Sequence, residues 1–334
     1  MAGGFAALGE PLIQLNALTR GPLRYVRYFE SHVAGSELNF CVAAVRNGMP
    51  CSMVARVGND EFGREVLEYA RGIGIDVSQV RGCELPTGVY FVQRGYPLPD
   101  SSELVYYRKG SAGSSLSPED VDEDLIKSCA LAHSSGITLA LGRGPREAVT
   151  KAFELAPKRG FDTNIRLRLW GADEARGAIG SLLDRFDFDL LVTDQEDTEI
   201  LLGVTDPEEA YSAYSKRGVK CLLYKLGAQG AIAFCEEGEF REPGYSVSVE
   251  DPTGAGDALA GTFASLYFSG KGVDYALRHA VAASALVVTV RGNNEITPGE
   301  KDAEKMISHL RGGRMPSSPT GRNPPGADPP KSDL

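Results

Sequence analysis

The residues with the clearest chemical potential lie in the run Asp251-Pro252-Thr253-Gly254-Ala255-Gly256-Asp257. Gly254 and Gly256 lack a Cβ atom, so the backbone can turn tightly there and a ligand can approach it closely. An apolar face at helical spacing follows, which predicts a helix whose first N–H groups attract anions. At such a helix start the carboxylate of Asp257 could accept a hydroxyl proton, while the amides hold the charge of a moving phosphoryl group.

The same run has a plainer interpretation, in which Gly254-Ala255-Gly256 is only a tight turn and Asp257 caps a helix. A bare G-x-G-D would favour that interpretation, but D-P-T-G-A-G-D followed by Gly261 is much more specific. The sequence contains no G-x-x-x-x-G-K-[ST], G-x-G-x-x-G, G-x-S-x-G or H-E-x-x-H. The pattern therefore favours phosphoryl transfer over the chemistries that those motifs mark.

The elements that would position Asp257 alternate between strands and helices. Short apolar runs predict buried strands, apolar residues at helical spacing predict helices, and Ser36 is a candidate cap for the first helix. A strand from Val247 is expected to lead into the glycine turn. This alternation predicts an α/β fold with a mostly parallel sheet covered by helices. The other expected strands are 5–9, 53–57, 130–133, 189–192, 221–224 and 231–234, and the other expected helices are 37–45, 62–72, 146–159 and 197–202.

Two segments break the alternation, and a third lacks apolar residues. Residues 11–33 lose helical periodicity, and residues 86–110 hold two β-rich runs around a Pro/Gly/Ser loop, as in a hairpin. From Gly312 onward the sequence is rich in Gly, Pro and Ser, so 312–334 is expected to be a disordered tail. The 334-residue chain is therefore expected to hold one large domain over residues 1–311.

Composition narrows the possible partners and compartment. A formal net charge of -10 argues against nonspecific binding to nucleic acid or to anionic membranes. The N-terminus lacks the features of a signal peptide, and the most apolar helical stretch, 280–290, is shorter than the roughly 20 residues of a membrane span. A cytoplasmic location is expected. The cysteines form no C-x-x-C pair and are interpreted as small apolar residues in a reducing cytosol: Cys41, Cys51, Cys83, Cys129, Cys221 and Cys235.

The β-rich runs offer a candidate binding face for an acidic small molecule. Leu104, Tyr106 and Arg108 alternate onto one side of a strand, so Tyr106 and Arg108 could reach one ligand together. The arginine fork matches a carboxylate, and Tyr90 on the partner strand could add a hydroxyl. Asn39 carries a donor and an acceptor for a sugar hydroxyl. The plainer interpretations are a half-exposed strand with ordinary aromatics and a polar residue in the first turn of a helix.

Over about residues 5–310 the chain resembles the ribokinase-like (PfkB) carbohydrate kinase family. Asp251 to Asp257 is similar to the C-terminal signature of that family, and Ala34 to Asn39 is similar to its N-terminal sugar-binding signature. Within the family the sequence is most similar to the archaeal 2-keto-3-deoxygluconate kinases. The stretches that carry this similarity are Leu8 to Leu12, Ser36 to Phe40, Val105 to Gly113 and Asp162 to Arg166.

The resemblance implies a fold, a reaction and an assembly. The fold would be a Rossmann-like, mostly parallel sheet with helices on both faces, plus a small β-sheet lid built from about residues 11–33 and 86–113. Mg²⁺ and ATP would be the cofactors, and a sugar acid would be the substrate, phosphorylated at its 6-hydroxyl with Asp257 as base. The galactonate epimer is a second candidate substrate. Contacts between lids would build a homo-oligomer.

The resemblance also implies roles for individual residues. The amides of Gly254, Ala255 and Gly256 would form the anion hole. The substrate would contact Gly35, Asn39, Tyr90, Tyr106, Arg108, Arg166, Asp257 and Asn293. The nucleotide would contact Asn164, Arg166, Lys225, Gly227, Gln229 and Gly230, as well as the anion hole. Arg166 could serve either the substrate carboxylate or a phosphate of ATP.

Two departures from the family pattern bear on these roles. The usual double glycine before the sugar site is here Ala34-Gly35, and the metal-associated N-x-x-E is here Asp194-Gln195-Glu196-Asp197. The second keeps an oxygen-rich pattern that suits Mg²⁺ through water, but it assigns no residue as a metal ligand. A neutral-sugar or nucleoside kinase of the same family is the alternative activity. A sugar-sensing protein or an assembly subunit that has lost chemistry is the alternative class, which the retained Asp257 argues against.

Overall fold

A computed structural model describes residues 3–99 and 101–311, which form two β-sheets and their covering helices. In the larger sheet the parallel strands are, in spatial order, β5, β4, β1, β8, β9, β10 and β11. At the β11 edge β12 and β13 follow, each antiparallel to its neighbour. The predicted mostly parallel α/β sheet is confirmed. The predicted tail, 312–334, lies outside the described residues. In spatial order the strands are β13 (Gly238–Pro243), β12 (Gly230–Cys235), β11 (Leu222–Lys225), β10 (Leu190–Asp194), β9 (Arg159–Asp162), β8 (Leu131–Ser135), β1 (Phe5–Leu8), β4 (Cys51–Gly58) and β5 (Asp76–Cys83).

The side chains of the short strand β1 alternate between apolar cores on the two faces of this sheet. Phe5 and Ala7 join the apolar core on one face, whereas Ala6 and Leu8 join the core on the other. All four residues are buried, as a parallel sheet covered on both sides requires. Because a buried Phe or Leu side chain stabilises the fold by about 1.5–3 kcal/mol, both layers hold this strand in place.

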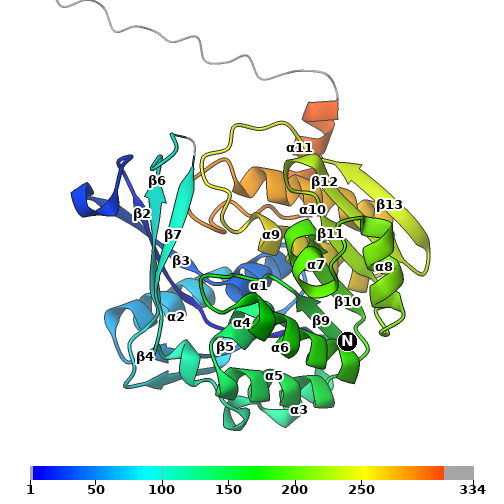
Figure 1. Cartoon of the computed structure of the whole chain (residues 1–334), viewed down its shortest axis with the longest axis horizontal. Coiled ribbons are helices and arrows are strands. Elements are labelled where there is room, and N and C mark those ends of the chain that lie inside the picture. Colours follow the sequence, from blue (N-terminus) through cyan, green and yellow to red (C-terminus); the bar gives the residue numbers. More distant parts are fainter. Residues whose placement is uncertain (1–2, 100, 312–334) are drawn as a thin grey trace, which may run out of the picture.

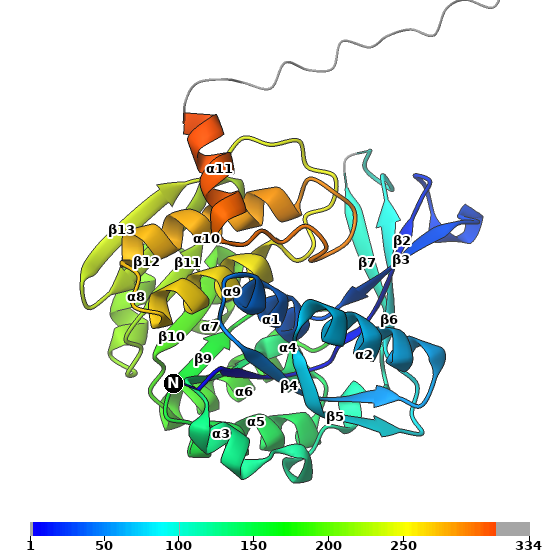
Figure 2. The same ribbon diagram turned by 180° about the vertical axis from the view of Figure 1, so that it is seen from behind.

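The helices divide between the two faces in agreement with the two cores (Figures 1 and 2). Figure 1 looks onto the face that carries α3 (Glu123–Ser128), α4 (Gly136–Ala140), α5 (Arg143–Leu155), α6 (Ala172–Arg185), α7 (Gln195–Leu202) and α8 (Pro207–Ser215). Figure 2 shows the opposite face, with α1 (Ser36–Arg46), α2 (Glu61–Ile73), α9 (Ala255–Phe268), α10 (Val273–Val287) and α11 (Glu300–Arg311). Within residues 3–99 and 101–311, none of these helices is long and apolar enough to cross a membrane.

The two segments that broke the alternation supply the second sheet, which stands to one side of the first (Figure 1). Strands β6 and β7 pair antiparallel with Tyr90 opposite Tyr106, which confirms the predicted hairpin. Strand β2 pairs parallel with β6 and antiparallel with β3. In spatial order this small sheet holds β3 (Phe29–Ala34), β2 (Leu12–Ala17), β6 (Val89–Arg94) and β7 (Ser102–Tyr107).

Three local predictions are wrong. Residues 244–254 form an irregular segment where a strand was expected, and the amides of Glu250 and Asp251 donate to the Val288 carbonyl instead of to a strand neighbour. The helix expected over 146–159 ends at Leu155, because the residue before Pro157 is disfavoured in helical backbone. Gly35, with φ of 137°, is the cap of α1 in place of Ser36, whose hydroxyl is used elsewhere.

The interpretation of all six cysteines as unpaired apolar residues is also wrong. Cys41 on α1 is bonded to Cys51 on β4, with Cα atoms 5.4 Å apart, and Cys221 is bonded to Cys235, with Cα atoms 4.2 Å apart. Cys83 and Cys129 are free. The bonded cysteines lie on or directly beside neighbouring elements, with Cys221 just before β11 and Cys235 at the end of β12. Only the packing of those elements brings their sulfur atoms together. Each disulfide therefore links two elements of the large sheet or its covering helices.

Candidate active site

The Asp257 carboxylate is half-buried at the start of α9, where neutral donors hold it. Oδ1 accepts a hydrogen bond from the Ser36 hydroxyl at 2.7 Å, and Oδ2 accepts one from the Asn39 amide at 2.8 Å. The Asn164 amide lies 3.4 Å from Oδ1. Burial raises the pKa of Asp257 to about 6, although the hydrogen bonds from Ser36 and Asn39 oppose the rise. Such a carboxylate is charged near neutral pH and basic enough to accept a proton.

The backbone before Asp257 forms the tight turn that the glycines predicted. Gly254 has φ of 83°, in the left-handed region that favours glycine, and it caps the start of α9. A Cβ atom at Gly254 would lie 2.1 Å from the carbonyl oxygen of Asn293, so only glycine fits this approach. A Cβ atom added at Gly256 would lie 3.5 Å from the Lys225 side chain. The first amides of a 14-residue helix and a lysine ammonium therefore meet at one place, which suits an anion.

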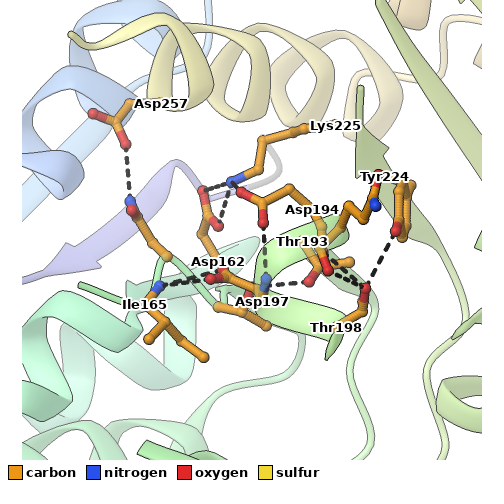
Figure 3. A network of polar contacts seen from close by, with 12 residues as sticks. Asp162, Ile165, Thr193, Asp194, Asp197, Thr198, Tyr224, Lys225 and Asp257 are labelled. Atoms are coloured by element: carbon orange, nitrogen blue, oxygen red, sulfur yellow. Dashed lines mark hydrogen bonds and ion pairs between the residues drawn. The ribbon is translucent and has the colours of Figure 1, made fainter. Parts of the chain in front are cut away.

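Lys225, at the end of β11, is held by carboxylates from two neighbouring strands (Figure 3). Its ammonium nitrogen lies 2.9 Å from Asp162 Oδ1 and 3.8 Å from Asp194 Oδ2. Burial works against the charge of Lys225, but these carboxylates and Asp197 raise its pKa above the ordinary value of 10.5. The lysine is therefore a fixed cation, and the carboxyl ends of β9, β10 and β11 set its position.

A cleft of about 320 Å³ lies between the small sheet and this edge of the large sheet. It brings together twelve of the residues predicted from the sequence, and it confirms that Leu104, Tyr106 and Arg108 face the same way. Those twelve are Gly35, Asn39, Tyr90, Tyr106, Arg108, Asn164, Arg166, Lys225, Gly254, Gly256, Asp257 and Asn293; the remaining lining residues are Leu12, Ser36, Ser102, Leu104, Ile137, Pro252 and Thr253.

At the small-sheet end, Arg108 is not a lone cation. Its guanidinium donates to Glu10 Oε2, with an Nε–O distance of 2.6 Å, and the Ser111 hydroxyl donates to the other oxygen of Glu10. Glu10 and Arg108 are 2% and 7% exposed, so the pair is buried. Arg108 also lies over the Tyr106 ring, 5.7 Å from its centre. Because a guanidinium has five N–H donors, some remain for a ligand after Glu10 is bound.

Two asparagines present polar atoms to the cleft that have no hydrogen-bond partner among the described residues. They are Oδ1 of Asn164 and Nδ2 of Asn293. Asn164 has φ of 32°, an uncommon backbone conformation that Asn tolerates better than most residues. The Asn293 side chain is fixed because its oxygen accepts from the Tyr90 hydroxyl at 3.0 Å. Free buried polar atoms and local backbone strain are both typical of ligand sites.

Four predicted residues do not line the cleft. Ala255 is the first residue of α9, beside Gly254, and presents its backbone there. Gly227, Gln229 and Gly230 form the turn between β11 and β12, directly after Lys225. They lie at the same edge of the sheet as the lysine, but the cleft that holds Asp257 does not reach them.

Sequence reasoning missed the residues that support the site. Ser36 was interpreted only as a cap, although Ser36 and Asn39 are three apart on one helix and so face the same side, which was a usable signal. Glu10 gave no signal of its own, because its partner Arg108 is 98 residues away. The carboxylates of Asp162 and Asp194 were also not assigned to Lys225.

The acidic cluster around Lys225 is a possible place for a divalent cation. Burial, followed by the charge of Asp194, raises the pKa of Asp197 to about 7, although the charge of Lys225 opposes the rise. However, within residues 3–99 and 101–311 no three His, Cys, Asp or Glu residues are arranged to hold a metal ion. The residues fit a cation that arrives with most of its ligands, as Mg²⁺ does with phosphates and water.

Comparison with known proteins gives consistent matches over most of the chain. Residues 4–299 match the family model described as pfkB family carbohydrate kinase. A 2-dehydro-3-deoxygluconokinase from Thermoproteus tenax is 58% identical over 306 residues, 91% of this chain and 94% of that protein. A 2-dehydro-3-deoxygalactonokinase from Haloferax volcanii is 28% identical, over 94% of this chain and 98% of that protein. A ribokinase II candidate from E. coli, solved with ATP and Mg²⁺, has a TM-score of 0.85 at 28% identity and covers 92% of this chain and 99% of that one.

Proposed function

Because this chain belongs to the pfkB family of carbohydrate kinases, we propose that it transfers the γ-phosphoryl group of ATP to the 6-hydroxyl of 2-keto-3-deoxygluconate, also called 2-dehydro-3-deoxygluconate. The observation that carries the chemistry is the half-buried Asp257 carboxylate, which faces one cleft together with the start of α9. The substrate rests on the relative from Thermoproteus tenax and on the two arginines that line the cleft.

In the proposed reaction Asp257 is the general base. The 6-hydroxyl oxygen attacks the γ-phosphorus, its proton moves to the Asp257 carboxylate, and the bond from the γ-phosphorus to the bridging oxygen breaks to release ADP. The amides of Gly254, Ala255 and Gly256, together with Lys225, would hold the negative charge of the phosphoryl group while it moves. The neutral donors Ser36 and Asn39 keep the carboxylate oriented without neutralising it.

The substrate would lie between the base and the small sheet. Arg108 and Arg166 make an acidic sugar a better fit than a neutral one, because the net charge of -10 would otherwise repel a carboxylate. Since Glu10 already offsets Arg108, that side chain supplies directed N–H donors, and Arg166 supplies the less compensated charge. Hydroxyl contacts are assigned to Gly35, Asn39, Tyr90, Tyr106 and Asn293. The galactonate epimer, the substrate in the name of the Haloferax volcanii relative, is a second candidate.

The nucleotide would lie along the edge of the large sheet, past Lys225. We assign its contacts to Asn164, Arg166, Lys225, Gly227, Gln229 and Gly230. Mg²⁺ would enter with the phosphates of ATP, near Asp162, Asp194 and Asp197, where it would offset phosphate charge. The E. coli neighbour crystallised with ATP and Mg²⁺ supports this pairing of ligands.

The outer face of the small sheet supports the proposal of a homo-oligomer assembled through the lids. Phe91 packs against Phe29 and Tyr107 on this face, with ring centres 5.2 and 5.5 Å apart, and Tyr107 is 67% exposed. Leu15 lies opposite Phe91 in the register of the sheet. A second copy could cover this aromatic surface while the opposite face of the sheet stays on the cleft. Sedimentation of the purified protein, with Tyr107→Glu as the disruptive variant, tests the assembly.

A substrate panel tests the activity. ADP release would be measured with 2-keto-3-deoxygluconate, 2-keto-3-deoxygalactonate, fructose, ribose and adenosine at fixed Mg-ATP. We expect the highest kcat/KM with one of the two keto acids. Turnover with neutral substrates alone would support the alternative, a neutral-sugar or nucleoside kinase of the same family, and would remove the acid from the proposal.

A further inference from the structure

The turn at residues 292–295, between α10 and α11, closes on itself through the partly exposed side chain of Glu295. Oε2 of Glu295 accepts from the backbone N–H groups of Asn293 at 3.0 Å and Asn294 at 3.1 Å. Gly292 has φ of 112°, and a Cβ there would lie 2.2 Å from Glu295 Oε2. A glycine is therefore required for the carboxylate to fold back over the turn, and the carboxylate fixes the orientation of both asparagines.

The other oxygen of Glu295 joins this turn to the small sheet. Oε1 lies 2.6 Å from Nδ1 of His32, which is on β3 and only 9% exposed. In Figure 2 the orange segment after α10 reaches toward the small sheet. Arg291, just before the turn, donates to Glu30 on the same strand at 2.7 Å. We call the His32–Glu295 contact the clasp.

From the turn, side-chain hydrogen bonds continue to the base. Nδ2 of Asn294 donates to Oδ1 of Asn39 at 2.6 Å and to the Val33 carbonyl at 3.1 Å. Because the Asn39 oxygen is occupied in this way, its NH₂ group must point to Asp257, where it donates at 2.8 Å. The Tyr69 hydroxyl donates to Oδ1 of Asn294. Exchanging the positions of Oδ1 and Nδ2 by a flip of this amide would therefore lose hydrogen bonds.

The neighbouring asparagine ties the same turn to the other parts of the cleft. The Asn293 carbonyl packs against Gly254, where no Cβ would fit, and its side-chain oxygen accepts from Tyr90. One short turn thus contacts the amide-bearing start of α9, the donor to the base and an inner residue of the small sheet.

We propose that His32 and Glu295 are positioning residues for the phosphoryl transfer: the clasp holds the 292–295 turn against β3, and the turn fixes the Asn39 amide on the Asp257 carboxylate. Neither residue lines the cleft, so both act through Asn294 and Asn39. The inference rests on the proposed role of Asp257 as base.

The charges around the clasp favour a protonated histidine. Burial lowers the pKa of His32, but the hydrogen bond and charge of Glu295, together with the charges of Glu30 and Asp251, raise it above 6.5 overall. The facing residue on β2, Gln14, is uncharged. Burial works against the ionised form of Glu295, but the hydrogen bond from His32 lowers its pKa overall. The ion pair therefore adds most to stability above the range in which Glu295 titrates and below the raised pKa of His32, and it is lost as pH rises through the latter.

Steady-state kinetics across pH separate a positioning role from a merely structural one. If the clasp orients Asn39, then His32→Ala should weaken a hydrogen bond that stabilises the charged form of Asp257. The acid limb of the kcat/KM profile for the sugar should then move up by about one pH unit, and kcat should fall by about tenfold or more. KM for ATP should change little.

Matched variants control for damage to the fold. In His32→Asn the amide nitrogen can take the place of Nδ1 without carrying charge, so it should recover much of kcat and return the acid limb toward the wild-type position. Glu295→Gln should resemble His32→Ala. His279→Asn alters another buried histidine, on α10, that lies outside the cleft, and it should leave the acid limb unchanged.

Two outcomes decide the matter. An upward shift of the acid limb in His32→Ala and Glu295→Gln, reversed in His32→Asn, supports the clasp. An acid limb at the wild-type position in both variants would overturn it, whatever the loss of thermal stability. Asp257→Asn is assayed beside them: if it retains turnover, the assigned base is wrong, whereas if it is inactive and the limbs do not move, only the clasp is wrong.

Discussion

At the end of the cleft formed by α1 and α9, Asp257 is surrounded by neutral donors, whereas at the small-sheet end Arg108 is paired with the buried carboxylate of Glu10. Arg108 is buried and Asp257 is half-buried, and both are held by hydrogen bonds. Ser36 and Asn39 fix the direction of Asp257 but leave its charge unpaired, so burial raises its pKa to about 6. Glu10 fixes Arg108 and also offsets its charge.

The difference agrees with what each end is proposed to do. A base must gain a proton during the reaction, and a fixed cation directly beside it would make the carboxylate a weaker acceptor. A recognition group keeps its charge state, so a buried counter-ion limits its desolvation cost and holds its donors in one geometry. Four predictions test this contrast, from the largest expected effect to the smallest.

Removing the base should have the largest effect. Asp257→Asn keeps the size of the side chain but cannot accept the hydroxyl proton, so we expect kcat to fall by roughly 10²- to 10⁴-fold. ATP affinity, measured by calorimetry, should be largely kept. Asp274→Asn, an exposed site on α10, is the matched control and should behave like the wild type. Wild-type turnover in Asp257→Asn would refute the assigned base.

Replacing Arg108, the cation proposed to bind the substrate carboxylate, should affect substrate binding and stability separately. Arg108→Ala loses charged hydrogen bonds to the acid, so KM for the acid should rise by roughly 10- to 100-fold and far more than KM for ATP. It also leaves the buried Glu10 carboxylate without its counter-ion, which should lower the free energy of unfolding by about 3–5 kcal/mol. The double variant Glu10→Gln/Arg108→Ala should regain stability in chemical denaturation but not the low KM. Equal rises in both KM values would move Arg108 out of the substrate site.

Activity should fall on the acid side as Asp257 takes up its proton. With a pKa of about 6, kcat/KM for the sugar should drop about tenfold per pH unit below that value. The folded pKa lies above the ordinary 3.8, so this group stabilises the fold most below 3.8 and loses that contribution as pH rises through about 6. Protonation of Asp257 in acid should therefore lower the activity without itself lowering the thermal midpoint. In Ser36→Ala the acid limb should move upward; an unchanged limb there would contradict the assignment.

The disulfides should give the smallest effect on catalysis, and it should be confined to stability. They close loops of 10 and 14 residues, which corresponds to about 2–3 kcal/mol each. Neither bond lines the cleft, so KM for the acid should stay the same while the thermal midpoint falls by several degrees in excess reductant. Thiol titration in denaturant without reductant should find the two thiols of Cys83 and Cys129. Six reactive thiols would show that the bonds do not form.

Local sequence patterns were sufficient to predict the fold and the candidate base. The apolar run at β1, the alternation of strands and helices, and the glycines before α9 are each set by a few neighbouring residues. The left-handed turn at Gly254 needs a glycine, and a carboxylate three residues later stands in the first turn of the helix. The missing strand near Val247 shows the limit of this reasoning, because an extended run becomes a strand only where a neighbour is free to pair with it.

Pairings between distant parts of the chain were decided by the tertiary structure alone. Ser36 and Asp257 are 221 residues apart, and Glu10 and Arg108 are 98 apart. The same holds for the clasp between His32 and Glu295, which are 263 residues apart. The bonded cysteines are only 10 and 14 residues apart, but their sulfur atoms also meet only in the packed layers. Backbone conformation follows from neighbours in sequence, whereas the charge state of a buried group depends on which side chains the packed layers place within a few ångströms of it. The chain itself therefore specified where a base could stand, and the fold decided that neutral donors would hold it.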